Sequence, residues 1–181
     1  MTELISEEKN FENRDWILLL TAAGIWGSSF LFMDVALESE HPGLITWLRP
    51  VLGLLALIWF PSSRRSIEPA DRWSVVLLGI TWVAFPFTMF PLAQQWIDSS
   101  ITGMLNSAMP IMTLIIGTLG FGVLIKRIQI LGILVGIIGI LLIGLPTVSG
   151  GGTNALGILF VVLAVTSYGV GVNVAGPLQR K

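Results

Sequence analysis

The sequence predicts an all-α integral membrane protein folded as a six-helix polytopic bundle. The chain of 181 residues is 54% hydrophobic and only 12% charged, whereas soluble domains carry about 25% charged residues. Six apolar runs follow one another, each near the length of about 20 residues that a helix needs to cross a bilayer. The connections between the runs are short, which makes consecutive helices antiparallel neighbours.

The predicted helices are preceded by residues 1–15, a polar and acidic stretch expected to form a cytoplasmic N-terminal tail. Lysine and arginine outside the helices gather in this tail, in the connections 62–72 and 124–127, and at the C-terminus, all on one side of the bundle. Because cytoplasmic loops carry an excess of these residues, both termini are predicted to be cytoplasmic. The six helices are expected at residues 16–37, 43–61, 73–96, 100–123, 128–146 and 155–176.

The fourth predicted helix has a polar face and a proline in its interior. On a helix with ~100° per residue, its small and polar residues fall within an arc of roughly 140°. Pro110 has no N–H, so the carbonyl of Asn106 four residues earlier loses its helical donor. In lipid such a break is tolerated where protein or water covers it. Two interpretations stay open: a helix that faces a solute, and a kinked helix with a small-residue packing seam.

The third predicted helix contains Pro86 and Pro91. In a regular α-helix these prolines free the carbonyls of Trp82 and Phe87. The helix is therefore expected to be bent or interrupted, as are helices that line transporter cavities. Together with Pro110, the two prolines are the candidate helix-break and gating positions.

Arg49 is the one basic residue inside a predicted span. It lies seven residues after Pro42, about 10 Å into the second helix at 1.5 Å per residue. An intramembrane arginine is expected to face the bundle or water and to have a partner. Asp34 lies at a comparable depth in the neighbouring helix, so an Asp34–Arg49 ion pair is one expectation. The alternative is an arginine whose side chain extends to the outer headgroups.

The composition argues against other classes of function. The chain has no cysteine and a single histidine, His41, so neither a metal site nor a cofactor is predicted. Catalysis by carboxylates inside the membrane would need a pair of them, and the spans offer Asp34 alone, so an enzyme is not predicted. The net charge of −1 gives no reason to expect nucleic acid as a partner.

Residues 17–27 and 159–169 show a weak internal similarity. Trp26-Gly27 aligns with Tyr168-Gly169. If the sixth helix begins a second copy, the repeat has five helices, and an odd number gives the two copies opposite orientations in the membrane.

Several segments, in this order and spacing, resemble the EamA-type branch of the drug/metabolite transporter superfamily. They are Trp26-Gly27-Ser28-Ser29-Phe30, Leu48-Arg49-Pro50, Leu92-Ala93-Gln94-Gln95, and Gly103 to Pro110. The resemblance covers about residues 16–180. It implies the first half of an inverted 5+5 helix repeat transporter, with residues 16–146 as the first five-helix repeat and residues 155–181 as the first helix of an incomplete second repeat.

The resemblance also implies a secondary transporter that exports small metabolites or drugs, in the inner (plasma) membrane of a bacterium. Its partners would be the lipid bilayer and a small-molecule solute. The path would be lined by the first, third, fourth and sixth helices. The residues expected near the substrate are Trp26, Ser28, Arg49, Gln95, Asn106 and Tyr168.

The chain stops after one helix of the predicted second repeat. Two interpretations follow: a piece of a longer transporter whose second half is missing, and a short form that works as a homodimer or with another chain. The alternative function is therefore a non-transporting membrane subunit, or a half-transporter that requires dimerisation.

Overall fold

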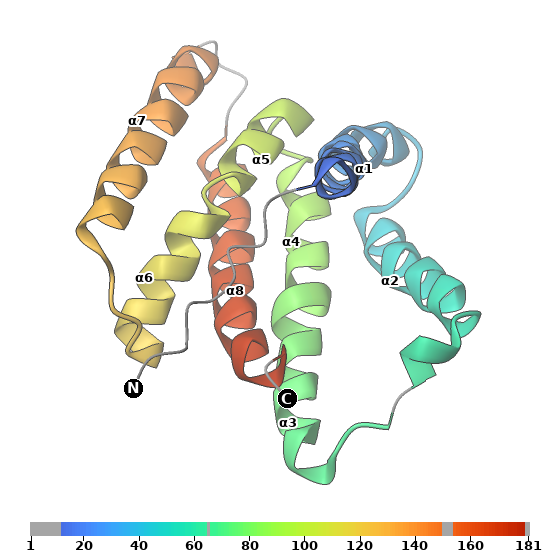
Figure 1. Cartoon of the computed structure of the whole chain (residues 1–181). Coiled ribbons are helices and arrows are strands. Elements are labelled where there is room, and N and C mark those ends of the chain that lie inside the picture. The colour runs from blue at the N-terminus through green and yellow to red at the C-terminus, as the bar shows by residue number, and fades with distance from the viewer. Residues whose placement is uncertain (1–11, 65, 150–153, 180–181) are drawn as a thin grey trace.

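The computed structural model describes residues 12–64, 66–149 and 154–179, and these residues form helices and no strand (Figure 1). The all-α fold class is confirmed, and every predicted span contains helix. Residues 1–11 of the predicted tail, together with Arg65, Arg180 and Lys181, lie outside the described residues. The main elements are α1 (Asn13–Leu37), α2 (Pro42–Ile58), α3 (Arg72–Leu78), the π-helix η3 (Gly79–Ala84), α4 (Phe85–Ala93), α5 (Ser99–Asn106), α6 (Met109–Phe121), α7 (Arg127–Ser149) and α8 (Ala155–Gln179).

Four helical stretches of the described chain are long and apolar enough to cross a membrane. They are Asn13–Leu37, Pro69–Ala93, Ser99–Phe121 and Ala155–Gln179. The second and third join several helical elements in one stretch. α2, with 17 residues, reaches about 26 Å at 1.5 Å per residue, somewhat less than the ~30 Å hydrocarbon core. The chain is therefore an integral membrane protein.

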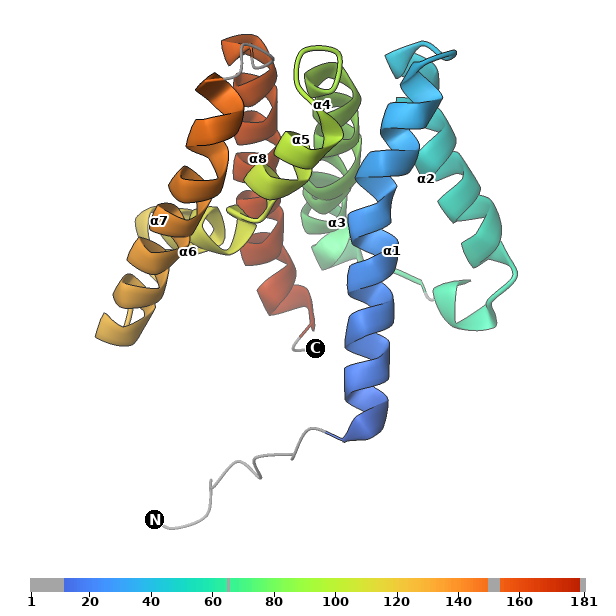
Figure 2. The same cartoon turned by 90° about the horizontal axis from the view of Figure 1, so that it is seen from above.

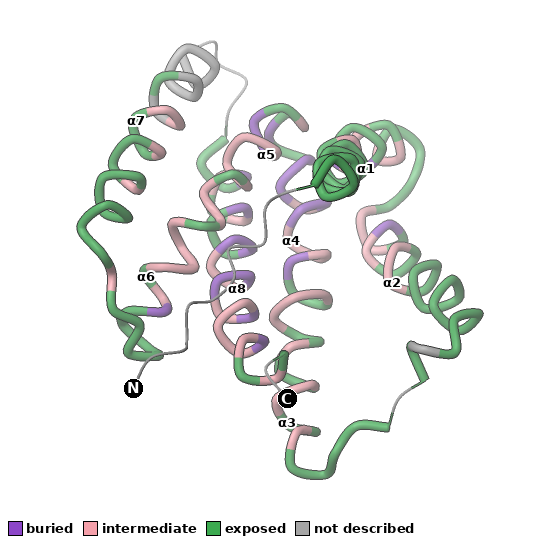
Figure 3. The backbone as a smooth tube through the Cα atoms, viewed as in Figure 1, coloured by how far each residue is buried: buried purple, intermediate pink, exposed green. Residues whose placement is uncertain are grey.

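α8 is the central helix of the molecule. It packs along α4 on one side and along α6 on the other (Figure 1). Figure 3 shows that buried positions concentrate on α8, α4 and α5, while α1, α2 and α7 are largely exposed. Lipid tails are as apolar as leucine, so the exposed apolar side chains of the outer helices suit a bilayer.

Two glycines let α8 approach its neighbours closely. A Cβ atom on Gly169 would lie 2.7 Å from Ile116 Cδ1 and 3.1 Å from the carbonyl oxygen of Met112. A Cβ atom on Gly157 would lie 3.0 Å from the carbonyl oxygen of Ala93. Small residues at such positions allow membrane helices to pack backbone against backbone.

The third predicted helix is interrupted by the π-helix η3. Within it, the N–H of Phe85 donates to the carbonyl of Ile80, five residues back. In a regular α-helix, Pro86 would leave the carbonyl of Trp82, four residues back, without its N–H donor. In the π register, the carbonyl without an N–H donor is instead that of Thr81, five residues before Pro86. Ser167 of α8 donates its hydroxyl proton to this carbonyl at 2.9 Å.

Pro91 acts as the α-helical rule predicts. The carbonyl of Phe87, four residues earlier, loses its helical donor. Thr46 of α2 lies beside it, and its hydroxyl oxygen is 3.2 Å from the Phe87 oxygen and 3.0 Å from that of Pro42. The proline thus creates an acceptor that a neighbouring span uses.

The fourth predicted span is divided into two helices. α5 ends at Asn106, and α6 begins at Met109 with Pro110 in its first turn. Proline suits the first turn of a helix, where its missing N–H has no intrahelical partner in any case. The chain changes direction between the two helices (Figure 2).

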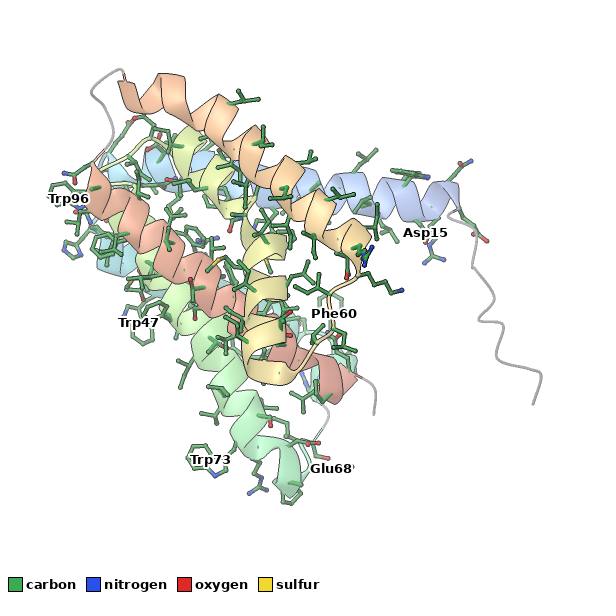
Figure 4. All side chains as sticks on the ribbon, turned by 90° about the vertical axis from the view of Figure 1, so that its left-hand side faces the viewer. Asp15, Trp47, Phe60, Glu68, Trp73 and Trp96 are labelled. Atoms are coloured by element: carbon green, nitrogen blue, oxygen red, sulfur yellow. The ribbon has the colours of Figure 1, made fainter. Side chains whose placement is uncertain are left out.

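Large tryptophans project from the surface of the bundle. Trp47 and Trp73 are 72% and 83% exposed, and Trp96 lies at the opposite end of the molecule from Asp15 (Figure 4). Trp at membrane–water boundaries is commonly an anchor. Trp73 and Trp96 lie at helix ends, and these positions predict an interfacial role for both.

We expect Gly169→Ala to lower the unfolding midpoint of the protein in detergent. The added methyl group meets the backbone of α6, and overpacking of this kind costs about 1–3 kcal/mol. Gly176→Ala is the control on the same helix, because a Cβ atom there meets nothing within 4 Å. Alanine in a helix is up to ~1 kcal/mol more favourable than glycine, so Gly176→Ala should keep or raise the midpoint. Equal midpoints for the two variants would contradict close packing at Gly169.

Candidate functional site

A cavity of about 600 Å³ lies between α1 and α5. Its size falls within the range of small-molecule sites, roughly 300–1,000 Å³. Trp26 and Phe30 line it from α1, and Ser99, Gly103, Asn106 and Ser107 from α5 and the turn that follows. The break between α5 and α6 therefore lies at the wall of a cavity.

Asn106 carries an unsatisfied polar atom at this wall. Its side-chain oxygen Oδ1 is buried and has no hydrogen-bond partner in the described part of the chain. A buried acceptor without a donor costs about 1–3 kcal/mol. Such groups are rare in native proteins, and each calls for an explanation.

Gln94 is the second buried amide with an unpaired oxygen. Its Nε2 donates to the backbone carbonyl of Phe30 at 3.1 Å, while its Oε1 has no partner among the described residues. The bond joins the end of α4 to α1. Gln94 is 8% exposed, whereas the residue expected near the substrate from the sequence is its neighbour Gln95.

A second cavity of about 570 Å³ lies between α1 and α2. Its lining is mainly apolar, with Ser28, Ser29 and Arg49 among the polar residues. The guanidinium carbon of Arg49 lies 4.4 Å from the centre of the Phe87 ring. Its Nη1 is 3.8 Å from the sulfur of Met33, a weak acceptor. Arg49 therefore faces the bundle through α4 and α1.

Asp34 and Arg49 do not pair. Ser99 of α5 donates its hydroxyl proton to Asp34 Oδ2 at 3.0 Å. Arg49 contacts Phe87 and Met33 instead. Asp34 thus joins α1 to α5, and the guanidinium stays without a carboxylate partner in the described chain.

Tyr168 lies in the core rather than on a cavity wall. It is 3% exposed, its ring centre lies 5.9 Å from that of Phe90, and a second aromatic contact joins it to Trp82 at 6.5 Å. Phe90 in turn meets Phe30 edge to face at 5.3 Å. A row of aromatic rings therefore runs from α8 through α4 to α1.

The six residues expected near the substrate occupy four places. Trp26 and Asn106 share the α1–α5 cavity, and Ser28 and Arg49 share the α1–α2 cavity. Gln95 lines a smaller cavity of about 220 Å³ near the start of α2, and Tyr168 is in the core. The described residues contain no group of three His, Cys, Asp or Glu side chains placed to hold a metal ion.

Comparison with known proteins places this bundle in a family. Residues 15–145 match the EamA-like transporter family. The chain belongs to this family. No solved structure matches the chain.

Three relatives of this EamA family member align with it over different fractions of its length. The uncharacterized transporter YoaV of Bacillus subtilis is 24% identical over 167 residues, which are 90% of this chain and 57% of that protein. The uncharacterized inner membrane transporter YedA of Escherichia coli K12 is 26% identical over 81% of this chain and 48% of its own length. Protein PagO of Salmonella typhimurium is 25% identical over 67% and 41%. The chain thus spans about half the length of these relatives.

We expect a cysteine at position 107 to be reached by water. The native chain has no cysteine, so single-cysteine variants need no background changes. Ser107→Cys should react with a charged thiosulfonate reagent in lipid nanodiscs, because a thiol at a wet cavity ionises. Val135→Cys is the control: Val135 on α7 is 69% exposed and should face lipid, where a thiolate does not form. Equally slow reaction at both positions would show that the α1–α5 cavity is dry.

Proposed function

We propose that this protein is a secondary transporter that exports small metabolites or drugs through the cavity between α1 and α5. The observation that carries the proposal is the buried Oδ1 of Asn106 at the cavity wall, which has no partner among the described residues. Membership of the EamA-like transporter family supports transport as the general activity. The relatives YoaV and YedA are named as transporters, the latter of the inner membrane.

The chemistry at Asn106 indicates the kind of solute. Rotation of the amide would bring its free oxygen to an N–H or O–H donor of a molecule in the cavity, which would relieve the cost of an unpaired acceptor. Trp26 and Phe30 offer aromatic faces to the rest of the molecule. The expected cargo is therefore a small amphipathic solute with at least one hydrogen-bond donor.

The proposed path uses α1, the α3–η3–α4 stretch, α5–α6 and α8. The aromatic row from Tyr168 through Phe90 to Phe30 supports the inclusion of α4 and α8, since Phe30 also lines the cavity. The positions of Pro86, Pro91 and Pro110 are proposed as the places at which helix segments move during gating.

The path needs a further wall, because the N-terminal half of α1 is exposed in this chain. We propose that a second five-helix repeat, begun here by α8, supplies it. A second copy of the chain is the alternative source, and it would make this protein a half-transporter.

Asn106→Leu should abolish most of the export. Leucine keeps the volume but removes the acceptor, whereas Thr118→Val changes an exposed polar residue of α6 outside the cavity lining and should have no effect. The measurement is untargeted mass spectrometry of the medium of cells that produce each chain at matched membrane levels.

The wild type should release at least one small metabolite above the empty-vector level. Release by Asn106→Leu equal to that of the wild type would overturn the proposed path. A wild type that matches the empty vector would identify a non-transporting subunit instead. Co-purification of two differently tagged, active copies would identify the half-transporter.

We also propose that both termini are cytoplasmic in a bacterial inner membrane. The start of α1 and the end of α8 lie away from the end where α1 passes to α2 and α4 passes to α5 (Figure 2). Arg14 belongs to the start of α1, and Arg64 and Lys126 belong to the connections α2–α3 and α6–α7, all opposite that end, as expected for the cytoplasmic side.

Single cysteines test this orientation in intact cells. An impermeant maleimide should label Ser39→Cys, in the exposed connection between α1 and α2. Ser66→Cys, in the exposed connection between α2 and α3, should react only after the cells are opened. The reverse pattern would place the termini outside.

A further inference from the structure

Most of the N–H donors of Arg49 have no hydrogen-bond partner in the described chain. A guanidinium carries five N–H donors. Within the described chain, the one hydrogen bond of Arg49 goes to the sulfur of Met33 at 3.8 Å, and the Phe87 ring covers one face of the guanidinium. The donors that remain belong to a residue that lines the α1–α2 cavity.

Among the residues that the structure describes, no acid neutralises this charge. Asp34 accepts a hydrogen bond from Ser99 of α5 instead. Glu40 lines the same cavity but forms no ion pair with Arg49 in the described chain. Glu40 precedes α2, whereas Arg49 lies seven residues into it, about 10 Å deeper at 1.5 Å per residue. Glu40 therefore lies at the outer mouth of the cavity and leaves the deeper part positive.

We infer that the α1–α2 cavity binds the anionic group of an amphipathic molecule through the guanidinium of Arg49. A charged residue inside a span is costly without a partner, and an anion in the cavity supplies that partner. Arginine suits a carboxylate or phosphate because its donors form a planar fork that can grip two oxygens.

The rest of the cavity fits an amphipathic molecule. Ile25, Phe32, Leu44 and Leu48 give it apolar walls for a chain or ring. The hydroxyl of Ser29 lines the cavity and makes no hydrogen bond within the described chain, so it is available as a further donor. Ser28 donates its proton to the carbonyl of Ile25 at 3.1 Å and can only accept.

The site is separate from the α1–α5 cavity, so it does not rest on the proposed transport path. Its ligand could come from two sources that share this chemistry: a soluble amphipathic carboxylate, or a membrane lipid with an anionic headgroup. Octanoate is the probe, with octanamide as its neutral match of equal length.

The test is equilibrium binding of radiolabelled octanoate to the full chain in phosphatidylcholine nanodiscs. Arg49→Gln should weaken binding about tenfold or more, because it removes a charge-assisted hydrogen bond. Arg72→Gln, at an exposed position at the start of α3, removes the same charge outside the cavity and should bind as the wild type does. Leu48→Trp keeps Arg49 but fills the cavity and should also weaken binding.

Adding phosphatidylglycerol to the nanodiscs separates the two sources. Loss of octanoate binding in the wild type would assign the site to a lipid headgroup, and unchanged binding would assign it to a soluble anion. Wild-type affinity in both Arg49→Gln and Leu48→Trp would overturn the inference, as would equal binding of octanamide and octanoate. Asn106→Leu should keep octanoate binding. The binding result can therefore be interpreted even if the transport proposal fails.

Discussion

Hydrocarbon offers no water to replace a missing hydrogen bond, so each carbonyl inside a span needs a donor from the protein. Pro86 and Pro91 remove two such donors from one span. Ser167 of α8 and Thr46 of α2 supply the replacements, at the carbonyls of Thr81 and Phe87. Each replacement joins spans that are distant in sequence. The interrupted helix and the packing of α2, α4 and α8 therefore depend on one another.

A polar side chain of α8 also joins this helix to α6. Asn173 donates to the carbonyl of Thr113 on α6 at 3.0 Å and to that of Gly169 in its own helix at 2.8 Å. Its oxygen lies 2.8 Å from the position that a Cβ atom on Gly117 would take. A small residue on α6 thus makes room for a polar side chain on α8. Bonds of this kind between membrane helices contribute roughly 0.6–2 kcal/mol each.

The helices and their breaks follow from features that a single sequence contains. Apolar length gives the spans, and Pro110 gives the division between α5 and α6. Details that depend on a neighbouring helix do not follow. The π register that shifts the effect of Pro86 to Thr81 is stabilised by Ser167, which lies 86 residues away.

The candidate site shows the same limit. A pair of glutamines at a helix end does not indicate which one points inward, and the structure buries Gln94 and exposes Gln95. Opposite charges at similar depth suggest a pair, yet Asp34 reaches Ser99 and Arg49 reaches Phe87. Spacing gives depth along a helix, but rotation about its axis is set by packing. The division into repeats and the roles of the site residues stay predictions.

α1 connects the two cavities because it forms a wall of both. Positions 23, 26, 27, 30 and 31 line the α5 side, and positions 25, 28, 29, 32, 33 and 36 line the α2 side. Each set follows the three-and-four spacing of one helix face, and an offset of two residues turns the second face by about 200° from the first. A single helix thus separates Asn106 from Arg49. A rotation or shift of α1 would therefore change the shape of both cavities at once.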